Sequence, residues 1–216
     1  MLHRRHAAFI AAASLVNAAV ALTVLGLAGS GSDGVELALR VTARVSFVYF
    51  VLAFVASPLH ALRPGTASRL LVRYRSALGV TFGLSMSMHV ALILRMFVLY
   101  APSRPPMVTL ADFLIGIPGL VFVALMTATS AATLKRRLGP VRWSQLHRTG
   151  LFFVWSIFFL CLVDSVSRKQ TRHPVLEYDV FIAILVAAML LRIAARRRAS
   201  GESARSVALA QRQGEW

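Results

Sequence analysis

Six long apolar runs dominate the sequence, and short clusters of charged residues separate them. The runs cover residues 7–28, 41–56, 78–100, 113–132, 151–163 and 180–195. The fifth run lengthens if it begins near Trp143, because Leu146 and Phe152 extend its apolar surface. An α-helix needs about 20 apolar residues to cross about 30 Å of hydrocarbon. Because a helix satisfies its backbone hydrogen bonds internally and an open strand does not, the runs predict membrane helices.

Composition agrees with this interpretation. Hydrophobic residues make up 57% of the 216-residue chain and charged residues only 15%, and the mean hydropathy is +0.69. The hydrophobic fraction is higher, and the charged fraction lower, than in ordinary soluble domains. We therefore predict an all-α, polytopic membrane six-helix bundle. Residues 1–198 form the six-span domain, and residues 199–216 form a polar cytoplasmic tail that we expect to be mostly disordered.

The first run has two possible interpretations. Arg4 and Arg5 before the run, and the small residues 28–30 after it, also describe a secretory signal peptide. However, the run 7–28 is longer than the about 7 to 15 apolar residues of a signal-peptide core. The length favours a retained membrane anchor, which also makes the number of spans even.

The basic residues predict the orientation of the bundle. If the N-terminus is cytoplasmic, 17 of the 24 Lys and Arg residues lie on the inner side, whereas six of the eight acidic residues lie on the outer side. The inner side then carries a net charge of +15 and the outer side +1. By the positive-inside rule, we expect both termini in the cytoplasm.

The overall charge of +16 does not predict nucleic-acid binding. The basic residues flank membrane segments, where they set topology and meet anionic lipid headgroups. A surface for a phosphate-bearing cofactor or an acidic partner is the alternative. The sequence contains no GxGxxG motif after a strand and no P-loop, so we expect no flavin or nicotinamide site within the chain.

Polar residues at membrane depth are the candidates for chemistry, because they are costly there. His89 lies near or beyond the middle of the third run. Its imidazole can ligate a metal, relay protons or bond to a neighbouring helix. His147 stands at the cytoplasmic start of the fifth run, and His60 ends the second run at the same face.

Three landmarks resemble the ferric reductase-like transmembrane domain superfamily. The first is Ser57-Pro58-Leu59, at the end of the second run. The second is Tyr74-Arg75-Ser76-Ala77-Leu78-Gly79, at the start of the third run, with His89 ten residues after the glycine. The third lies between the fourth and fifth runs and reads Arg136-Arg137-Leu138-Gly139, followed by Trp143 and Leu146-His147-Arg148. The superfamily includes the haem-binding membrane subunit of bacterial methionine sulfoxide reductase systems, the membrane part of NADPH oxidases and six-span metalloreductases. The likeness spans nearly the whole membrane core.

The resemblance implies a b-type haem between the third and fifth helices, with axial histidines on the iron. The candidate ligands of the haem iron are His89 and His147, and His60 and Arg148 are weaker candidates for cofactor binding. Two imidazoles at equal depth on neighbouring helices can occupy both axial positions of a porphyrin.

One departure from the family pattern breaks this pair. Leu160 stands where members of the family often carry a further histidine, and Arg75 occupies the inner position that would partner His147. Met86 and Cys161 are conceivable substitutes, since thioether and thiolate both ligate haem iron. Two arrangements remain: haem on His89 with a weak or absent second ligand, or haem on His147 near the cytoplasmic face with His60 nearby.

The resulting hypothesis is a haem b electron-transfer protein of the bacterial inner membrane, an oxidoreductase component. A separate cytoplasmic reductase or the quinone pool would supply electrons, and ferric iron, a quinone or a periplasmic protein would accept them. The competing hypothesis is a haem-less scaffold or small permease-like protein. In that case His89 and Asp164 mark a proton or substrate path, and His147 and Arg148 cap helices or bind lipid phosphate.

Overall fold

The structure, a computed structural model, describes residues 2–100, 110–167 and 176–213. These residues form helices and short turns, and no strand is found among them. The helices are α1 Leu2–Ala28, α2 Ser32–Leu62, α3 Thr66–Tyr100, α4 Leu110–Ala128, α5 Ala132–Leu138, α6 Pro140–Ser167 and α7 Leu176–Gln213. The all-helical prediction is confirmed for these residues.

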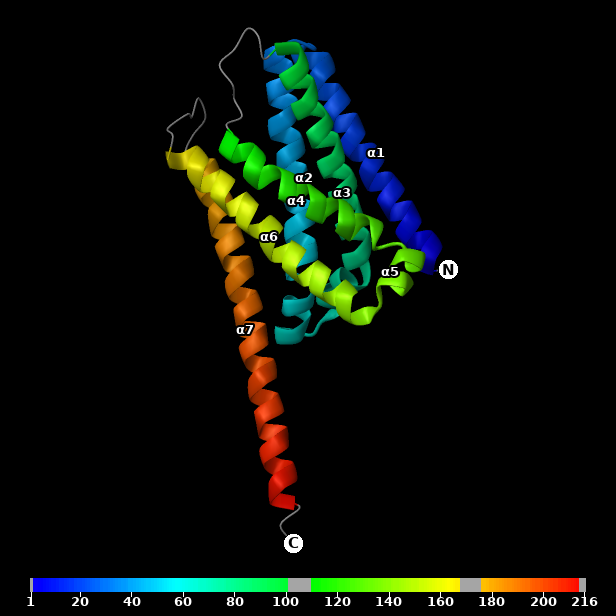
Figure 1. Cartoon of the computed structure of the whole chain (residues 1–216), viewed down its shortest axis with the longest axis vertical. Helices are drawn as coiled ribbons and strands as arrows, with labels where there is room; N and C mark the ends of the chain where they lie inside the picture. Colours follow the sequence, from blue (N-terminus) through cyan, green and yellow to red (C-terminus); the bar gives the residue numbers. More distant parts are fainter. Residues whose placement is uncertain (1, 101–109, 168–175, 214–216) are drawn as a thin grey trace.

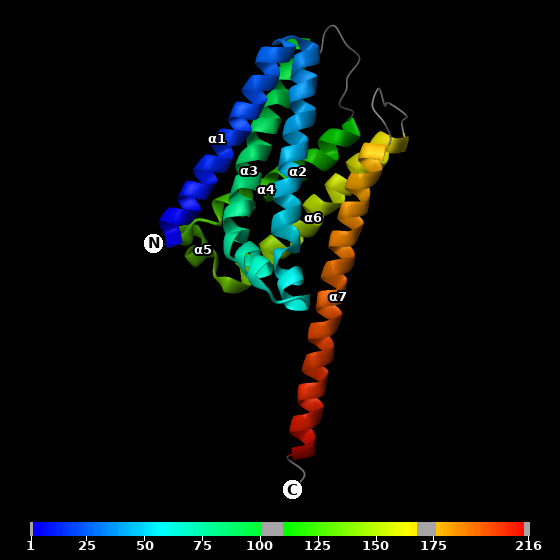
Figure 2. The ribbon, with the colours of Figure 1, turned by 180° about the vertical axis from the view of Figure 1, so that it is seen from behind.

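The long helices fall into two groups. Helices α1, α2 and α3 lie side by side, whereas α4 and α6 cross one side of this group at an incline (Figure 1). Helix α7 packs against α2 and α6 and extends well beyond the other helices, as Figure 2 shows from behind. The contact between α3 and α4 joins the two groups. Helix α3 therefore faces α1 and α2 on one side and α4 on another.

Five of the described helices are long and apolar enough to cross a membrane, namely α1, α2, α3, α6 and α7. Helices α4 and α5 meet at a bend of 107° and give a sixth span if the pair counts as one. Large apolar side chains such as Leu15, Leu22 and Val98 are exposed on the outside of the helices. Lipid is the solvent that favours such a surface. The chain is an integral, multi-pass membrane protein.

The fourth predicted run differs from the structure at its C-terminal end. The run extends to residue 132, but α4 ends at Ala128 and α5 begins at Ala132. Thr129 and Ser130 stand at the break, where their hydroxyls donate to the carbonyls of Leu125 and Met126 at 2.6 and 2.8 Å. Such side-chain bonds offer the backbone an alternative to a continued helix. A hydropathy average does not detect this competition, because it takes no account of hydrogen bonds from side chains to the backbone.

The polar tail also differs from expectation. Helix α7 continues through Gln213, where the sequence predicts a mostly disordered segment. Residues 199–213 contain no proline, and nine of the fifteen are Ala, Arg, Gln or Glu, which are good helix formers. Arg198 and Glu202 pair across one turn with an N–O distance of 2.9 Å. Once α7 has begun in the membrane, extending it is favourable because nucleation is the costly step.

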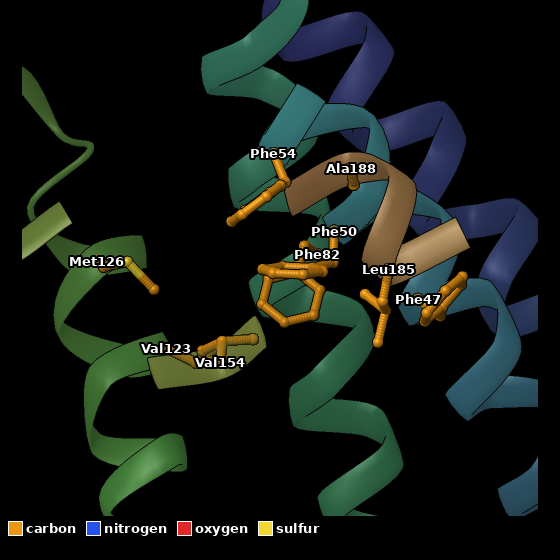
Figure 3. Close-up of a cluster of buried hydrophobic side chains, with 9 residues drawn as sticks. All are labelled: Phe47, Phe50, Phe54, Phe82, Val123, Met126, Val154, Leu185 and Ala188. Carbon is orange, nitrogen blue, oxygen red and sulfur yellow. The ribbon is translucent and has the colours of Figure 1, made fainter. Parts of the chain in front are cut away.

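Aromatic side chains fill the centre of the molecule. The buried cluster takes residues from five helices (Figure 3): Phe47, Phe50 and Phe54 of α2, Phe82 of α3, Val123 and Met126 of α4, Val154 of α6, and Leu185 and Ala188 of α7. The ring centroid of Phe50 lies 5.5 Å from that of Phe82 and 5.2 Å from that of Phe158 on α6. These distances are typical of packed aromatic pairs. The space between α2, α3 and α6 is thus occupied by side chains at this level.

Candidate functional site

His89 contacts α2. Its Nδ1 atom lies 2.9 Å from the hydroxyl oxygen of Thr42, and Thr42 is fully buried. The interface between α2 and α3 therefore fixes the imidazole at membrane depth, as the sequence predicts for a polar residue with a structural or chemical reason to be there.

The hydrogen bonds of Thr42 determine the tautomer of His89. The Thr42 hydroxyl lies 2.9 Å from the carbonyl of Ala38 and 3.1 Å from that of Leu39. Its single proton is committed to these carbonyls, which can only accept. The oxygen of Thr42 must then accept a bond from Nδ1–H of His89. With the proton on Nδ1, the neutral imidazole keeps an unshared pair on Nε2.

A polar seam lies beside this pair, across α1, α2 and α3. The amide of Asn17 donates to the hydroxyl of Ser85 at 2.9 Å, and that hydroxyl lies 2.7 Å from the hydroxyl of Ser46. All three residues are buried. Hydrogen bonds of this kind replace the missing hydrophobic force between helices in lipid. They hold α1 and α2 against the face of α3 that also carries His89.

His147 forms the second histidine–threonine pair. Its Nε2 atom lies 3.2 Å from the hydroxyl oxygen of Thr129. That hydroxyl already donates to the carbonyl of Leu125 at 2.6 Å, so its oxygen accepts from Nε2–H of His147. Trp143 covers the imidazole with a ring-centroid distance of 4.3 Å, and its indole N–H donates to the carbonyl of Thr129 at 3.1 Å.

His147 borders a cavity of about 120 Å³ between α2, α3, α4 and α6. Both polar and apolar side chains line it. The polar or small residues are Arg75, Ser76, Gly79, Thr127, Ser130, Trp143 and His147, and the apolar ones are Phe50, Ala53, Phe82, Val123, Met126 and Leu151. A cavity of this size is smaller than the about 300–1,000 Å³ of typical cofactor sites.

The two remaining candidates lie elsewhere. His60 contacts Ser68 at the turn between α2 and α3, with 3.0 Å between Nδ1 and the hydroxyl oxygen, and it is not among the residues that line the cavity. Arg148 is exposed on α6. The structure therefore does not bring His60 to His147, so the sequence-based arrangement with haem on His147 and His60 nearby gains no support.

His89 and His147 are far apart along the membrane. Arg75 lines the same cavity as His147, and His89 follows Arg75 by fourteen residues on the same helix. At 1.5 Å per residue this separation is about 21 Å. The two imidazoles cannot both reach one iron atom. Leu160, at the position of the family's further histidine, is 51% exposed, and Cys161 is exposed as well.

The candidate iron ligands fit a haem in one respect only. A metal-binding histidine usually donates its other ring N–H to a fixed acceptor, and His89 does so toward Thr42. A second imidazole ligand at the depth of His89 is absent from the described residues, which also contain no group of three or more His, Cys, Asp or Glu side chains that could hold a metal ion. His89 can thus supply one axial ligand.

No protein-family model, curated protein or solved structure matches this chain. The argument for function therefore depends on the residues and their geometry. Thr42 and Thr129 are the functional neighbours that sequence reasoning missed. A threonine within an apolar run is a weak signal, since it also occurs as a packing residue that bonds to its own helix.

Proposed function

We propose a six-span topology in the bacterial inner membrane with both termini in the cytoplasm. Helix α4 has 19 residues, and at 1.5 Å per residue it extends about 28 Å, enough to cross most of the hydrocarbon. In Figure 1 the N-terminus, the α2–α3 turn and α5 lie toward the lower end of the helix bundle, and the C-terminus lies farther down, at the end of α7. The basic residues of the inner set occur in these segments, as the positive-inside rule requires.

We further propose that the protein carries electrons through a b-type haem whose iron is bound by Nε2 of His89. The observation that carries this proposal is the 2.9 Å contact between Nδ1 of His89 and the Thr42 hydroxyl, which itself donates to the carbonyl of Ala38. We infer from it that Nδ1 carries the proton and that Nε2 keeps an unshared pair. Haem supplies a one-electron redox centre, and the protein tunes it through the axial ligand and its second hydrogen bond. Thr42 orients the imidazole, and the apolar helices around it exclude water.

The donor and acceptor follow from the proposed topology. A separate cytoplasmic reductase or a membrane quinone would deliver electrons, since the Gly-x-Gly-x-x-Gly string at residues 29–34 joins two helices instead of following a strand. The net positive inner face would attract an acidic reductase. Ferric iron, a quinone or a periplasmic protein would accept electrons at the outer face. The chain would thus act as the membrane component of an oxidoreductase.

An absorption spectrum tests the haem proposal. The full chain is expressed with ample haem supply, purified in detergent and measured oxidised and dithionite-reduced. We expect a Soret band that shifts on reduction and disappears in His89→Ala, because that change removes the axial nitrogen. Thr42→Val should keep the band but lower haem affinity by about 10- to 100-fold, the usual effect of losing the partner of a ligating histidine.

His60→Ala is the matched control, since His60 pairs with Ser68 at the end of the bundle and should not alter the spectrum. A colourless wild-type protein would overturn the haem proposal. The haem-less scaffold or permease-like protein is then the second candidate. The packed rings of Phe50, Phe82 and Phe158 favour it, because they close the space between α2, α3 and α6 without a cofactor.

A further inference from the structure

The cavity beside His147 contains a charge without a counter-charge. Arg75 lines the cavity and is half-buried. Its guanidinium makes no hydrogen bond or ion pair with any residue that the structure describes. A cation in a partly apolar site is costly unless an anion or several acceptors compensate it. The positive charge of Arg75 in this cavity thus has no compensating negative charge among the described residues.

The chain has few carboxylates that could compensate the charge of Arg75. On the inner side the sequence contains two acidic residues, Glu202 and Glu215. Glu202 already pairs with Arg198 on α7, and Glu215 lies outside the described residues. Lys135, whose amine lies 4.2 Å from the ring centre of Trp143, adds a second positive charge near the cavity. Among the described residues no carboxylate pairs with Arg75, so we look for the compensating anion outside the chain.

We propose that this cavity binds the phosphate group of an anionic phospholipid, with Arg75 as the main ligand. Guanidinium groups match phosphate oxygens in geometry and charge. Ser76, the next residue, also lines the cavity and has a hydroxyl available to donate. The hydroxyls of Thr127 and Ser130 already donate to the carbonyls of their own helix, so Arg75 and Ser76 are the donors that remain.

The depth of the cavity assigns the phosphate to lipid. Arg75 precedes the start of the apolar run at Leu78 by three residues, which is about 5 Å along a helix. This is the boundary between hydrocarbon and headgroups. Phe82 and Leu151, which follow Arg75 and His147 along α3 and α6 into the apolar runs, also line the cavity, and they suit an acyl chain. The volume of about 120 Å³ equals that of about four waters and is sufficient for a phosphate group.

This site is separate from the proposed haem site. Arg75 lies about 21 Å along α3 from His89, and lipid binding requires no haem. A chain that binds phosphatidylglycerol but shows no Soret band would support the lipid site and overturn only the haem proposal. The reverse result would overturn only the lipid site.

Two variants test the site in different ways. Arg75→Gln removes the charge. Gly79→Leu keeps Arg75 but fills the cavity, and it should fold because a Cβ atom at Gly79 meets no atom within 4 Å. The controls are Arg73→Gln, an exposed arginine on the same helix, and Gly26→Leu, where a Cβ atom on α1 also has open space.

The experiment measures lipid retained by the full chain in detergent, by native mass spectrometry, together with the thermal unfolding midpoint. Phosphatidylglycerol, phosphatidylcholine and inorganic phosphate are added in separate titrations. We expect wild type and both controls to retain phosphatidylglycerol and to gain stability from it. Arg75→Gln and Gly79→Leu should weaken this binding by about tenfold or more, the usual effect of losing a charge-assisted hydrogen bond.

Each other outcome contradicts part of the proposal. Equal retention of phosphatidylglycerol by all variants would overturn the site. Equal retention of phosphatidylcholine and phosphatidylglycerol would overturn the requirement for an anionic headgroup. Stabilisation by inorganic phosphate, without retained phospholipid, would overturn the lipid assignment and identify a soluble phosphate as the ligand. If Arg75→Gln does not fold, Gly79→Leu alone decides the result.

Discussion

The two histidine–threonine pairs use the same hydrogen bonds in different surroundings. In each, a threonine hydroxyl donates to a carbonyl of its own helix and accepts from the imidazole of a neighbouring helix. The pair of Thr42 and His89 lies in the interface between α2 and α3, beside the buried seam of Asn17, Ser46 and Ser85. The pair of Thr129 and His147 lies at the break between α4 and α5, next to a cavity.

This difference shows that surroundings, rather than residue type, set the role of a membrane histidine. His89 bonds through Nδ1 to a fully buried threonine within a tightly bonded group of helices, which suits a ligand that must not move. His147 bonds to Thr129 just after α4, and the indole of Trp143 covers its ring. This arrangement suits a residue in the wall of a small binding cavity. Three sets of substitutions can test the contrast.

The largest effect is expected from Ser85→Val. The hydroxyl of Ser85 joins Asn17 and Ser46, so valine leaves buried polar groups of α1 and α2 without partners. The free energy of unfolding should fall by about 3 kcal/mol, measured by denaturation with sodium dodecyl sulfate in mixed micelles. Ser87→Val is the control, because Ser87 is exposed on the same helix and bonds only to Gly83. An equal loss in both variants would contradict the seam.

A smaller loss is expected from Gly83→Ala, which tests the contact between α3 and α4. A Cβ atom at Gly83 would collide with the side chain of Thr127 on α4. Threonine is stiff at χ1, so the helices must separate, at a cost of about 2 kcal/mol in the free energy of unfolding. Gly79→Ala, four residues earlier, should instead raise it by about 1 kcal/mol, since that position has open space. Equal effects would contradict the close approach.

The smallest effects compare the two pairs directly. Thr42→Val should lower the free energy of unfolding by about 1 kcal/mol and Thr129→Val by about 0.5 kcal/mol. Thr42 is fully buried, so its loss leaves Nδ1–H of His89 without an acceptor. Thr129 lies at a helix end where water can replace the bond. Thermal unfolding of the two variants in detergent gives the measurement. A larger loss for Thr129→Val would reverse the comparison.

Much of the fold follows from the hydropathy of the sequence. The apolar runs predict the membrane-crossing helices, because hydrocarbon forces every backbone group into an internal bond. Helix ends are less predictable. The polar segments 32–40 and 66–77 continue α2 and α3 as helices, since a helix extends easily once it has begun. The break after Ala128 depends on side-chain bonds of Thr129 and Ser130 that hydropathy does not detect.

The candidate site follows from the sequence only in part. His89 and His147 stand out as polar residues near membrane segments, and Leu160 at the position of a further family histidine already breaks the expected pair of haem ligands. Their partners could not be predicted, because Thr42 and Thr129 are common residues in apolar helices. The role of Arg75 was equally hidden: an arginine near a helix end usually sets topology, and only packing shows that it faces a cavity.

The sequence by itself determined that this chain is a helical membrane protein with a strongly basic set of loops and ends, since hydropathy and charge act locally along the chain. The tertiary structure decided which polar groups meet. The tautomer of His89 and the uncompensated charge of Arg75 depend on side chains from different helices, brought together by packing around Phe50 and its neighbours. Such contacts depend on distances in space, which residue spacing along one chain does not specify.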